Sequence, residues 1–288
     1  MRADQAYIWL KEALTQAGMT PEEAHSEARL LLAAALDVPL SHLPLHRRET
    51  VEEAWLLPRL QRRRQGEPLQ YILGETEFMG LTLRALPQAL IPRGDSEVVV
   101  ERAVALARQL ADRQHLPPLA GDICTGSGAF AVALACFLPD FTVYAVDISP
   151  GALTVARENC QLNHTEDRVR LLEGDLLLPL QAQGLRLSLL IANPPYIPSQ
   201  EIAALDRELQ YEPWAALDGG PDGLSFYRRL AVQAGQVLYP GGRLILEHGA
   251  GQRAGVCAIL REAGWTVWET GDDYGGRDRF VVAGLAGD

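Results

Sequence analysis

Apolar residues recur at intervals of three and four over the first part of the chain, which is the spacing of amphipathic helices. This pattern predicts helices over residues 4–17 and 20–36, and a third within the run AWLLPRLQRRRQ, which Gly66 would end. Residues 74–86 instead alternate around a glycine, as in a β-hairpin. The N-terminal part is therefore predicted to be a small helical bundle followed by a hairpin.

Two of these helices are preceded by the pattern of a capping box, in which a hydroxyl residue stands three positions before a glutamate. Thr20 and Glu23 show it before the second helix, and Thr50 and Glu53 show it before the third. The run Arg62–Arg64 lies near the end of the third helix. We expect these arginines to form a solvent-exposed face, with contact to a protein partner or RNA as the alternative.

From residue 95 onward, short apolar strands alternate with amphipathic helices, which predicts βαβ units, a parallel sheet and an α/β fold class. The last two strands, 265–270 and 279–284, are joined by the Gly-rich run GDDYGGRDR, which is too short for a crossover helix. We expect these two strands to pair antiparallel. The other strands of the sheet are predicted at 119–124, 142–147, 168–173, 187–192 and 243–248.

Acidic residues outnumber basic ones, since 37 Asp and Glu stand against 26 Lys and Arg and give a net charge of −11. This excess disfavours a polyanion as the main partner, because counterion release needs clustered cations. The four cysteines are scattered, without a C-x-x-C pair or a histidine at zinc-site spacing, so no metal site is predicted. No apolar run has the length of a transmembrane helix or of a signal-peptide core, so we expect a soluble cytoplasmic protein without membrane contact.

The first motif with chemical meaning is the turn C-T-G-S-G, which joins an apolar strand to an apolar helix. Its glycines allow unusual backbone angles and leave no side chain between the backbone and a ligand, while the helix N-terminus offers free N–H groups. The turn is neither a P-loop nor a G-x-G-x-x-G nicotinamide motif, and a purely structural turn is the alternative. The candidate cofactor-binding residues are Cys124, Thr125, Gly126, Ser127 and Gly128.

Two acidic residues follow the next two strands. Asp147 ends its strand about 20 residues after the turn, where a carboxylate can accept hydrogen bonds from two ribose hydroxyls. Asp147 could instead cap the next helix, but Ser149 before Pro150 already has that pattern. Asp175 could accept from the amine of a base while Leu176 packs on the ring, with a loop or capping role for Asp175 as the alternative.

The most specific motif is N-P-P-Y, directly after the strand 187–192. Pro194 and Pro195 fix the backbone and remove two donors, so nearby carbonyl groups are free to accept. The Asn193 side-chain oxygen and the Pro194 carbonyl could then bind an NH₂ group, and Tyr196 offers a flat face to a planar substrate. Such a pocket suits an amide or a base amine, and an Asn-Pro turn with a core tyrosine is the structural alternative.

These motifs together resemble the class I S-adenosylmethionine-dependent N-methyltransferases. Within that group the chain is similar to the HemK-type (PrmC) glutamine N5-methyltransferases of peptide chain release factors, with further similarity in QYILGETEFMGL, LIPRGDSEVVVE, YEPWAALDGGPDGLSFYRRL, EHGAGQ and GGRDRF. N-P-P-Y alone is shared with DNA adenine and RNA guanine methyltransferases. The chain departs from the family pattern at Cys124, which replaces a glycine, at Gly94, Asp95 and Ser96 within P-R-x-E-T-E, and at His248 within E-I-G.

The resemblance implies a fold, a cofactor and a partner. The fold would be a Rossmann-like, seven-stranded class I methyltransferase domain with an antiparallel last strand over residues 91–288, after a helical substrate-recognition domain over 1–72 and a hairpin linker over 73–90. S-adenosylmethionine would be the methyl donor and S-adenosylhomocysteine the product. The partner would be a peptide chain release factor, methylated on the glutamine of its Gly-Gly-Gln motif.

The same resemblance assigns roles to residues: Asn193, Pro194 and Tyr196 are the expected catalytic residues, Asn193 also contacts the cofactor, and Pro195, Arg93 and Glu97 help to bind the substrate. Three other functions stay open, namely a glutamine methyltransferase of a ribosomal protein, an NPPY-type nucleic-acid amine methyltransferase, and a non-catalytic module that binds release factor or ribosome. A nucleic-acid substrate is disfavoured, because residues 86–288 hold 16 Arg and no Lys against 25 acidic residues.

Overall fold

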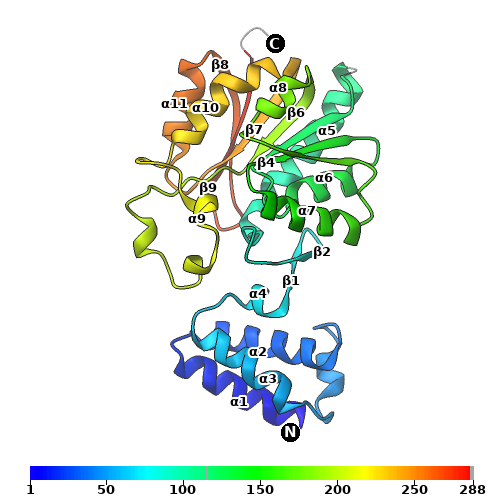
Figure 1. The fold of residues 1–288 in the computed structure, drawn as a ribbon, viewed down its shortest axis with the longest axis vertical. Coiled ribbons are helices and arrows are strands. Elements are labelled where there is room, and N and C mark those ends of the chain that lie inside the picture. Colours follow the sequence, from blue (N-terminus) through cyan, green and yellow to red (C-terminus); the bar gives the residue numbers. More distant parts are fainter. Residues whose placement is uncertain (115, 286–288) are drawn as a thin grey trace. The chain divides into compact units, whose positions relative to one another are not determined.

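The structure is a computed structural model that describes residues 1–114 and 116–285. The chain forms two compact units (Figure 1). A helical unit comprises Met1–Gly74 together with the short segment Asp206–Tyr211, and a sheet unit comprises Glu75–Leu205 and the chain from Glu212 onward. The chain therefore leaves the sheet unit once, contributes six residues to the helical unit, and returns.

Amphipathic helices build the helical unit, and their apolar faces form its core. Leu10, Leu14, Leu31 and Leu56 are fully buried there. The elements are α1 (Ala3–Gln16), α2 (Pro21–Leu36), the 3₁₀ turn η1 (Leu43–His46), α3 (Glu53–Arg64) and α4 (Leu69–Leu73). The three predicted helices are therefore present, and the short α4 was not foreseen.

One of the two predicted capping boxes forms. The Thr20 hydroxyl accepts from the Glu23 N–H at 3.3 Å, and the Glu23 carboxylate accepts from the Thr20 N–H at 2.9 Å. The prediction for Thr50 is wrong, because α3 begins after Glu52 without a side-chain cap. Thr50 instead forms an isolated β-bridge with Arg2, so tertiary pairing overrides the local pattern.

The exposed face expected for the run Arg62–Arg64 is wrong for its middle residue. Arg63 is 4% exposed, donates to both carboxylate oxygens of Glu27 at 2.6 and 2.8 Å, and also pairs with Glu208. Glu208 lies in the segment Asp206–Tyr211, so it belongs to the same unit. A buried guanidinium needs carboxylate partners, and one of these lies 145 residues away in the sequence, where no local pattern could indicate it.

The sheet unit is built on one seven-stranded sheet with the strand order β5-β4-β3-β6-β7-β9-β8. Neighbouring strands are parallel from β5 to β7, whereas β9 is antiparallel to both β7 and β8. The predicted antiparallel last strand is thus confirmed. The strands are β3 (Leu119–Ile123), β4 (Thr142–Asp147), β5 (Val169–Glu173), β6 (Leu187–Ala192), β7 (Leu238–Glu247), β8 (Trp265–Asp272) and β9 (Asp278–Leu285).

Helices cover both faces of this sheet (Figure 1). On one face α5 (Glu97–Gln114), α6 (Ala129–Phe137) and α7 (Pro150–Leu162) bury apolar residues against the strands. On the other face the covering helices are α8 (Leu178–Ala182), α10 (Ser225–Gln233) and α11 (Arg253–Glu262). Between β6 and α10 lie η3 (Ile202–Ala204), η4 (Leu209–Tyr211) and α9 (Trp214–Leu217), and η5 (Ala234–Gln236) follows α10.

The predicted hairpin is also present, as β1 (Glu75–Phe78) and β2 (Leu81–Arg84). Its two turn residues, Met79 and Gly80, both have positive φ values, of 53° and 73°, as a tight two-residue hairpin turn requires. Glu97, which follows the 3₁₀ turn η2 (Gly94–Ser96), accepts a hydrogen bond from the Met79 N–H at 2.6 Å. The hairpin is therefore attached to the start of α5.

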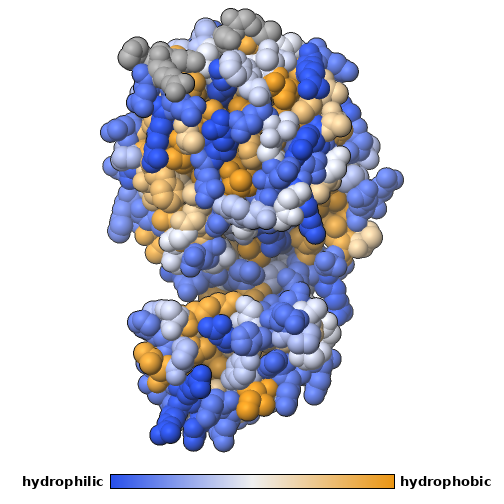
Figure 2. All heavy atoms as spheres, turned by 180° about the vertical axis from the view of Figure 1, so that it is seen from behind, coloured by the Kyte–Doolittle hydropathy of each residue, from blue (hydrophilic) through white to orange (hydrophobic). Residues whose placement is uncertain are grey.

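Polar side chains cover most of the face shown in Figure 2, with apolar side chains visible between them. Over the ranges that the structure describes, every helix is too short or too polar to cross a membrane.

Candidate active site

The strand order reverses at β3, because β4 lies on one side of it and β6 on the other. Ligands of open α/β sheets bind outside the carboxyl ends of the strands at such a reversal. Here the carboxyl ends of β3, β4 and β6 are followed or formed by Cys124, Asp147 and Asn193. The topology thus brings together three of the motifs that the sequence singles out.

A cleft of about 480 Å³ opens at this edge, which is within the usual size range of small-molecule sites. A smaller hollow lies beside the Gly turn and is lined by Arg93, Thr125 and Phe130 among others. The cleft and the hollow share Leu90, Cys124, Gly126 and Asn193 as lining residues. The cleft itself is lined by the predicted residues Cys124, Gly126, Asp147, Asp175, Leu176, Asn193 and Pro195.

The turn between β3 and α6 uses its two glycines differently. Both have positive φ values, 55° at Gly126 and 79° at Gly128. A Cβ atom on Gly128 would lie 2.9 Å from the Cβ of Ala156, so this glycine lets α6 pack closely on α7. A Cβ atom on Gly126 would meet nothing within 4 Å, so here the backbone is open to the cleft. Gly128 serves packing, and Gly126 leaves room for a ligand.

Cys124 departs from the family's glycine and also has a positive φ, of 61°. This conformation is costly for a residue with a side chain, which explains why glycine is usual at the position.

Asp122, at the end of β3, supports the same turn and was missed by the sequence reading. Its Oδ2 atom accepts from the Thr125 hydroxyl at 2.5 Å and from the Ala131 N–H at 3.0 Å. The side chain is fully buried, and burial raises its pKa to about 7, against the opposing effect of these two hydrogen bonds. An acidic residue inside an apolar strand was the available signal for this role.

Asp147 lies where the sequence placed it, at the end of β4 and in the wall of the cleft. Its two oxygens accept from the Gly126 N–H at 2.8 Å and the Ser149 N–H at 2.9 Å. Burial raises the pKa of Asp147, and these two hydrogen bonds lower it. Ser149 caps α7 by accepting from the Ala152 N–H at 3.2 Å. A carboxylate has about four acceptor sites, so Asp147 retains the capacity to accept from two hydroxyls.

Asp175 and Leu176 line the cleft beyond β5. Asp175 forms an ion pair with Arg229 of α10, a cation that the sequence reading did not connect with the site. Leu176 is buried, and its backbone has a positive φ of 50°. Arg229 therefore holds the Asp175 carboxylate, which was predicted to accept a hydrogen bond from the amine of a nucleobase.

In the N-P-P-Y motif, Asn193 lies in the wall of both the cleft and the hollow, and Pro194 and Pro195 are buried. The Tyr196 carbonyl accepts from the Gln252 side chain at 2.8 Å. A Cβ atom on Gly249 would lie 3.0 Å from the Tyr196 ring, so this glycine packs directly against it. The motif is therefore held by the chain that follows β7.

Arg93 and Glu97, the predicted substrate-binding residues outside N-P-P-Y, both have partners within the sheet unit. Arg93 lines the hollow and pairs with Glu212, a buried carboxylate that also accepts from the Ile91 N–H at 3.0 Å. The Glu97 carboxylate binds the hairpin turn. A contact between either side chain and the substrate stays a prediction.

The remaining departures from the family pattern keep the same chemistry or are structurally accommodated. Asp95 stands for glutamate and pairs with Arg279 at 3.4 Å, and Ser96 stands for threonine and donates to Glu247 at 2.9 Å. His248 is fully buried, with Nδ1 2.9 Å from the Gly249 carbonyl, and burial lowers its pKa. Its burial and its contact with the backbone favour a structural role for His248.

Comparison with known proteins agrees with this geometry. Residues 5–74 match the family model of the PrmC N-terminal domain, and residues 100–209 match that of the methyltransferase small domain. The chain is 42% identical to the release factor glutamine methyltransferase of Geobacter sulfurreducens, over 97% of this chain and 95% of that protein. It is 46% identical to the enzyme of the same name from Moorella thermoacetica, over 78% of this chain and 77% of that protein.

The chain belongs to the release factor glutamine methyltransferase family.

Solved structures of more distant proteins share the fold of this release factor glutamine methyltransferase family member. The ribosomal protein L11 methylase of Lactobacillus delbrueckii subsp. bulgaricus matches with a TM-score of 0.50 at 18% identity, over 70% of this chain and 84% of that chain. The N-terminal domain of human METTL16, solved in complex with SAH, matches with a TM-score of 0.52 at 18% identity, over 73% of this chain and 77% of that chain. The predicted class I methyltransferase fold is confirmed.

Proposed function

We propose that this methyltransferase transfers the methyl group of S-adenosylmethionine to the side-chain amide nitrogen of the Gly-Gly-Gln glutamine in peptide chain release factors, leaving S-adenosylhomocysteine. The observation that carries the proposal is the place of Asn193, which lines both the cleft and the hollow at the strand reversal. The name of the relatives, release factor glutamine methyltransferase, supports release factor as the protein substrate. A cytoplasmic location, where translation takes place, follows from the same proposal.

The residues of the cleft fit this methyl donor. Asp147 has acceptor sites left for two ribose hydroxyls, and Asp175 and Leu176 border the place of the base. The open backbone at Gly126 admits the rest of the molecule without a side chain in the way. When bound, the donor supplies an electrophilic methyl group on a positively charged sulfur.

The acceptor nitrogen is a poor nucleophile, because the lone pair of an amide nitrogen is delocalised into its carbonyl group. The Asn193 side-chain oxygen and the Pro194 carbonyl are acceptors for the two N–H groups of the glutamine amide. These hydrogen bonds raise electron density on the nitrogen and favour its pyramidal geometry. Tyr196 supplies a flat surface for the amide plane. Fixed orientation contributes further, and it is worth about 7–11 kcal/mol in well-oriented systems.

This mechanism needs no strong general base, since the methylated amide is acidic enough to lose its proton afterwards. In keeping with this mechanism, His248, which directly follows β7, is buried and contacts a backbone carbonyl.

The test is mass spectrometry of purified release factors incubated with the enzyme and S-adenosylmethionine. We expect a mass increase of one methyl group on the peptide that contains Gly-Gly-Gln, and no increase when that glutamine is replaced by alanine. A ribosomal protein, naked DNA and rRNA serve as competing substrates. Labelling of any of these in preference to release factor contradicts the proposal and favours the corresponding alternative.

The helical unit is proposed to bind the protein substrate. It carries a groove of about 550 Å³ whose lining includes Tyr7, Ile8, His25 and Leu32. Ile8 is 56% exposed, and the Tyr7 hydroxyl lies 2.6 Å from His25 Nδ1 at the groove wall. Ala3, Leu43 and Pro44 extend the apolar lining beside Ile8 and Leu32, and a contiguous apolar patch that is open to solvent is typical of a protein-binding surface.

The variant Ile8→Glu tests this role. It should raise KM for intact release factor about tenfold, because a charge enters an apolar contact, and leave the affinity for S-adenosylmethionine unchanged. Leu57→Glu is the matched control, since Leu57 is an exposed apolar residue of α3 that does not line the groove. Equal effects of the two variants would assign the loss to general destabilisation.

A further inference from the structure

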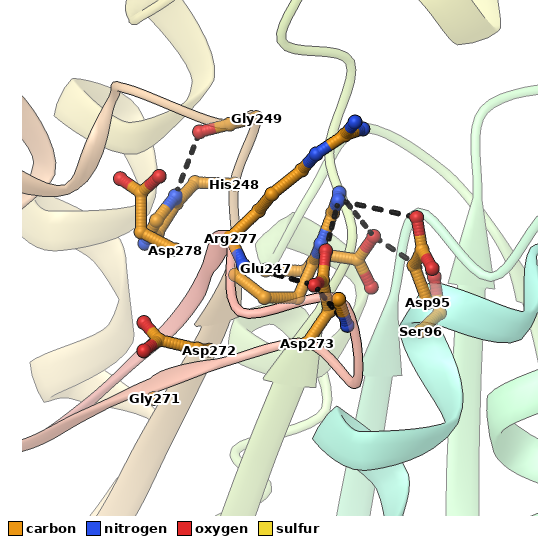
Figure 3. Close-up of polar contacts among 12 residues, drawn as sticks. Asp95, Ser96, Glu247, His248, Gly249, Gly271, Asp272, Asp273, Arg277 and Asp278 are labelled. Atoms are coloured by element: carbon orange, nitrogen blue, oxygen red, sulfur yellow. Dashed lines mark hydrogen bonds and ion pairs between the residues drawn. The ribbon is translucent and has the colours of Figure 1, made fainter.

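A cluster of charged residues, buried except for Asp95, lies next to the N-P-P-Y motif. Its centre is Arg279 of β9, whose side chain is only 9% exposed. Arg279 donates to Asp273 at 2.9 Å and to Asp95 at 3.4 Å, and it lies 3.9 Å from a carboxylate oxygen of Glu247. That oxygen of Glu247 also accepts from the Ser96 hydroxyl. Asp95, Ser96, Glu247 and Asp273 thus converge from three segments of the chain (Figure 3).

Stability alone does not explain this cluster. It combines one guanidinium with three carboxyl groups, and both Arg279 Nε and Glu247 Oε2 are buried without a hydrogen-bond partner among the described residues. Buried charges are costly, and apolar residues of similar volume are often as stable or more stable in such places. A buried polar network of this kind therefore points to a role in placing a neighbouring group.

The neighbouring group is Tyr196. Its backbone is bound by Gln252, which also accepts from the Gly249 N–H at 3.0 Å, and one side of its ring packs on Gly249. Gly249 comes two residues after Glu247, so the cluster and the ring are supported by the same end of β7. Burial raises the pKa of Tyr196, the Glu247 carboxyl raises it further, and the Arg279 guanidinium lowers it. The Arg279 carbonyl accepts from the His248 N–H at 2.9 Å, one residue before the glycine that packs on the Tyr196 ring, so Arg279 and the ring border the same turn.

We propose that Arg279 is a positioning residue that holds the hydroxyl end of Tyr196, while Asp273 and Asp95 hold Arg279. The ring then has one orientation, with its backbone fixed by Gln252 and its side packed on Gly249. The proposal rests on the proposed function, because Tyr196 matters to the reaction only if N-P-P-Y binds the acceptor amide. It also explains why Asp95 and Ser96 keep the carboxylate and hydroxyl of the family pattern.

The first test is a double-mutant cycle on the full-length enzyme with intact release factor. Arg279→Met and Tyr196→Phe should each lower kcat about tenfold with less than about threefold change in KM, and the double variant should be no worse than the worse single variant. Arg279→Lys should recover part of the rate, because it restores the charge. Multiplicative losses, near a hundredfold in the double variant, would show that Arg279 acts independently of Tyr196 and overturn the proposal.

Arg253→Met is the matched control. Arg253 also has a buried, unpartnered Nε atom within the described part of the chain, and it pairs with Asp272 and donates to the Gly271 carbonyl at the neighbouring end of β8. It takes no part in the contacts of Tyr196 given above, so its loss should leave kcat unchanged. A loss equal to that of Arg279→Met would indicate general loosening of this end of the sheet and contradict a specific role.

A second measurement does not depend on the substrate. In protein labelled with ¹³C at the tyrosine Cζ atom, the signal missing from Tyr196→Phe identifies Tyr196, and its titration is followed by NMR. Arg279→Met should move that titration to higher pH, because a stabilising positive charge is lost. An unmoved titration overturns the proposal even if release factor is methylated, and a moved titration without methylation of release factor would instead contradict the proposed function.

Discussion

The cleft has a cofactor side, around Asp147, and an acceptor side, around the N-P-P-Y motif. Side chains on the cofactor side come from residues at or just after the end of a strand. Side chains that support the acceptor side come from segments far apart in the chain. Asp122 and Asp147 lie at the ends of β3 and β4, and both bond the turn between β3 and α6, to which Thr125 belongs. On the acceptor side, Tyr196 depends on the chain after β7 and borders a cluster centred on Arg279. Apart from Arg229 of α10, which pairs with Asp175, the cofactor side is assembled at the ends of neighbouring strands, whereas the acceptor side is assembled by contacts between distant segments.

This difference has consequences for how each side responds to substitution. A local assembly depends on a few backbone hydrogen bonds, so a change there should affect ligand binding. A remote assembly fixes orientation through several partners, so a change there should affect the rate more than binding. The predictions below test this distinction.

Asn193→Ala should have the largest effect, because Asn193 lies where both sides meet. It removes one of two acceptors for the amide N–H groups, and we expect kcat to fall about 10²- to 10³-fold. Affinity for S-adenosylmethionine, measured by calorimetry, should change much less. Asn193→Asp keeps an acceptor of the same size and should retain more activity than the alanine variant. A loss of cofactor affinity as large as the loss of rate would place Asn193 on the cofactor side alone.

Asp147→Ala should weaken S-adenosylmethionine binding about 10- to 100-fold, since it removes the proposed ribose contacts and two backbone hydrogen bonds, one of which holds the turn between β3 and α6. Calorimetry gives the change in Kd directly. Asp140→Ala is the control, because Asp140 is an exposed acidic residue just before the opposite end of β4. Unchanged affinity in Asp147→Ala would remove Asp147 from the cofactor site.

Glu247→Gln should change how stability depends on pH. Burial raises the pKa of Glu247 to about 7, so the folded protein keeps this proton to a higher pH than the unfolded chain does. Its contribution to the free energy of unfolding is therefore fully present below the ordinary carboxyl pKa and is lost as the pH rises toward 7. Relative to the variant, the wild type should lose about 3 kcal/mol between about pH 4 and pH 8.

Urea unfolding at a series of pH values measures this difference. Glu269→Gln is the control, because Glu269 is a half-exposed carboxylate paired with Arg102. It should give the same pH dependence as the wild type. Parallel curves for wild type and Glu247→Gln would show that Glu247 has the same pKa in the folded and the unfolded protein, and would contradict the raised pKa.

Cys124→Gly should have the smallest effect. Glycine adopts the positive φ of this position without strain, but it loses more backbone entropy on folding, so we expect a net gain of about 0.5 kcal/mol. The midpoint of urea unfolding measures it. A loss of stability would mean that the packing of the Cys124 side chain outweighs the strain of its backbone.

Much of the fold could be predicted from sequence because its signals are local. The periodicity placed the seven strands, and the helix caps at Ser149 and Thr20 followed from short patterns, whereas the short α8 was not predicted. The prediction of a cap at Thr50 was wrong because Thr50 pairs with Arg2 in an isolated β-bridge. Local patterns predict an element well where no tertiary partner competes for its residues.

In the active site, too, only the features that depend on local motifs could be predicted. The positions of Asp147, Asp175 and Asn193 at one sheet edge followed from motif and strand order. Arg279 and Glu247 could not be connected by sequence, because their contact arises from the antiparallel pairing of β7 with β9. Arg63 is a similar case, since its burial depends on Glu208. A contact between residues that lie far apart in the sequence has no characteristic spacing from which it could be predicted.

The segment Asp206–Tyr211 also affects the order in which the protein is completed during synthesis. Met1–Gly74 leaves the ribosome first, yet this unit lacks Glu208, the second carboxylate partner of Arg63, until residue 208 has been made. At ordinary translation rates that interval is on the order of ten seconds. The unit that is translated first is therefore finished only after most of the sheet unit has emerged.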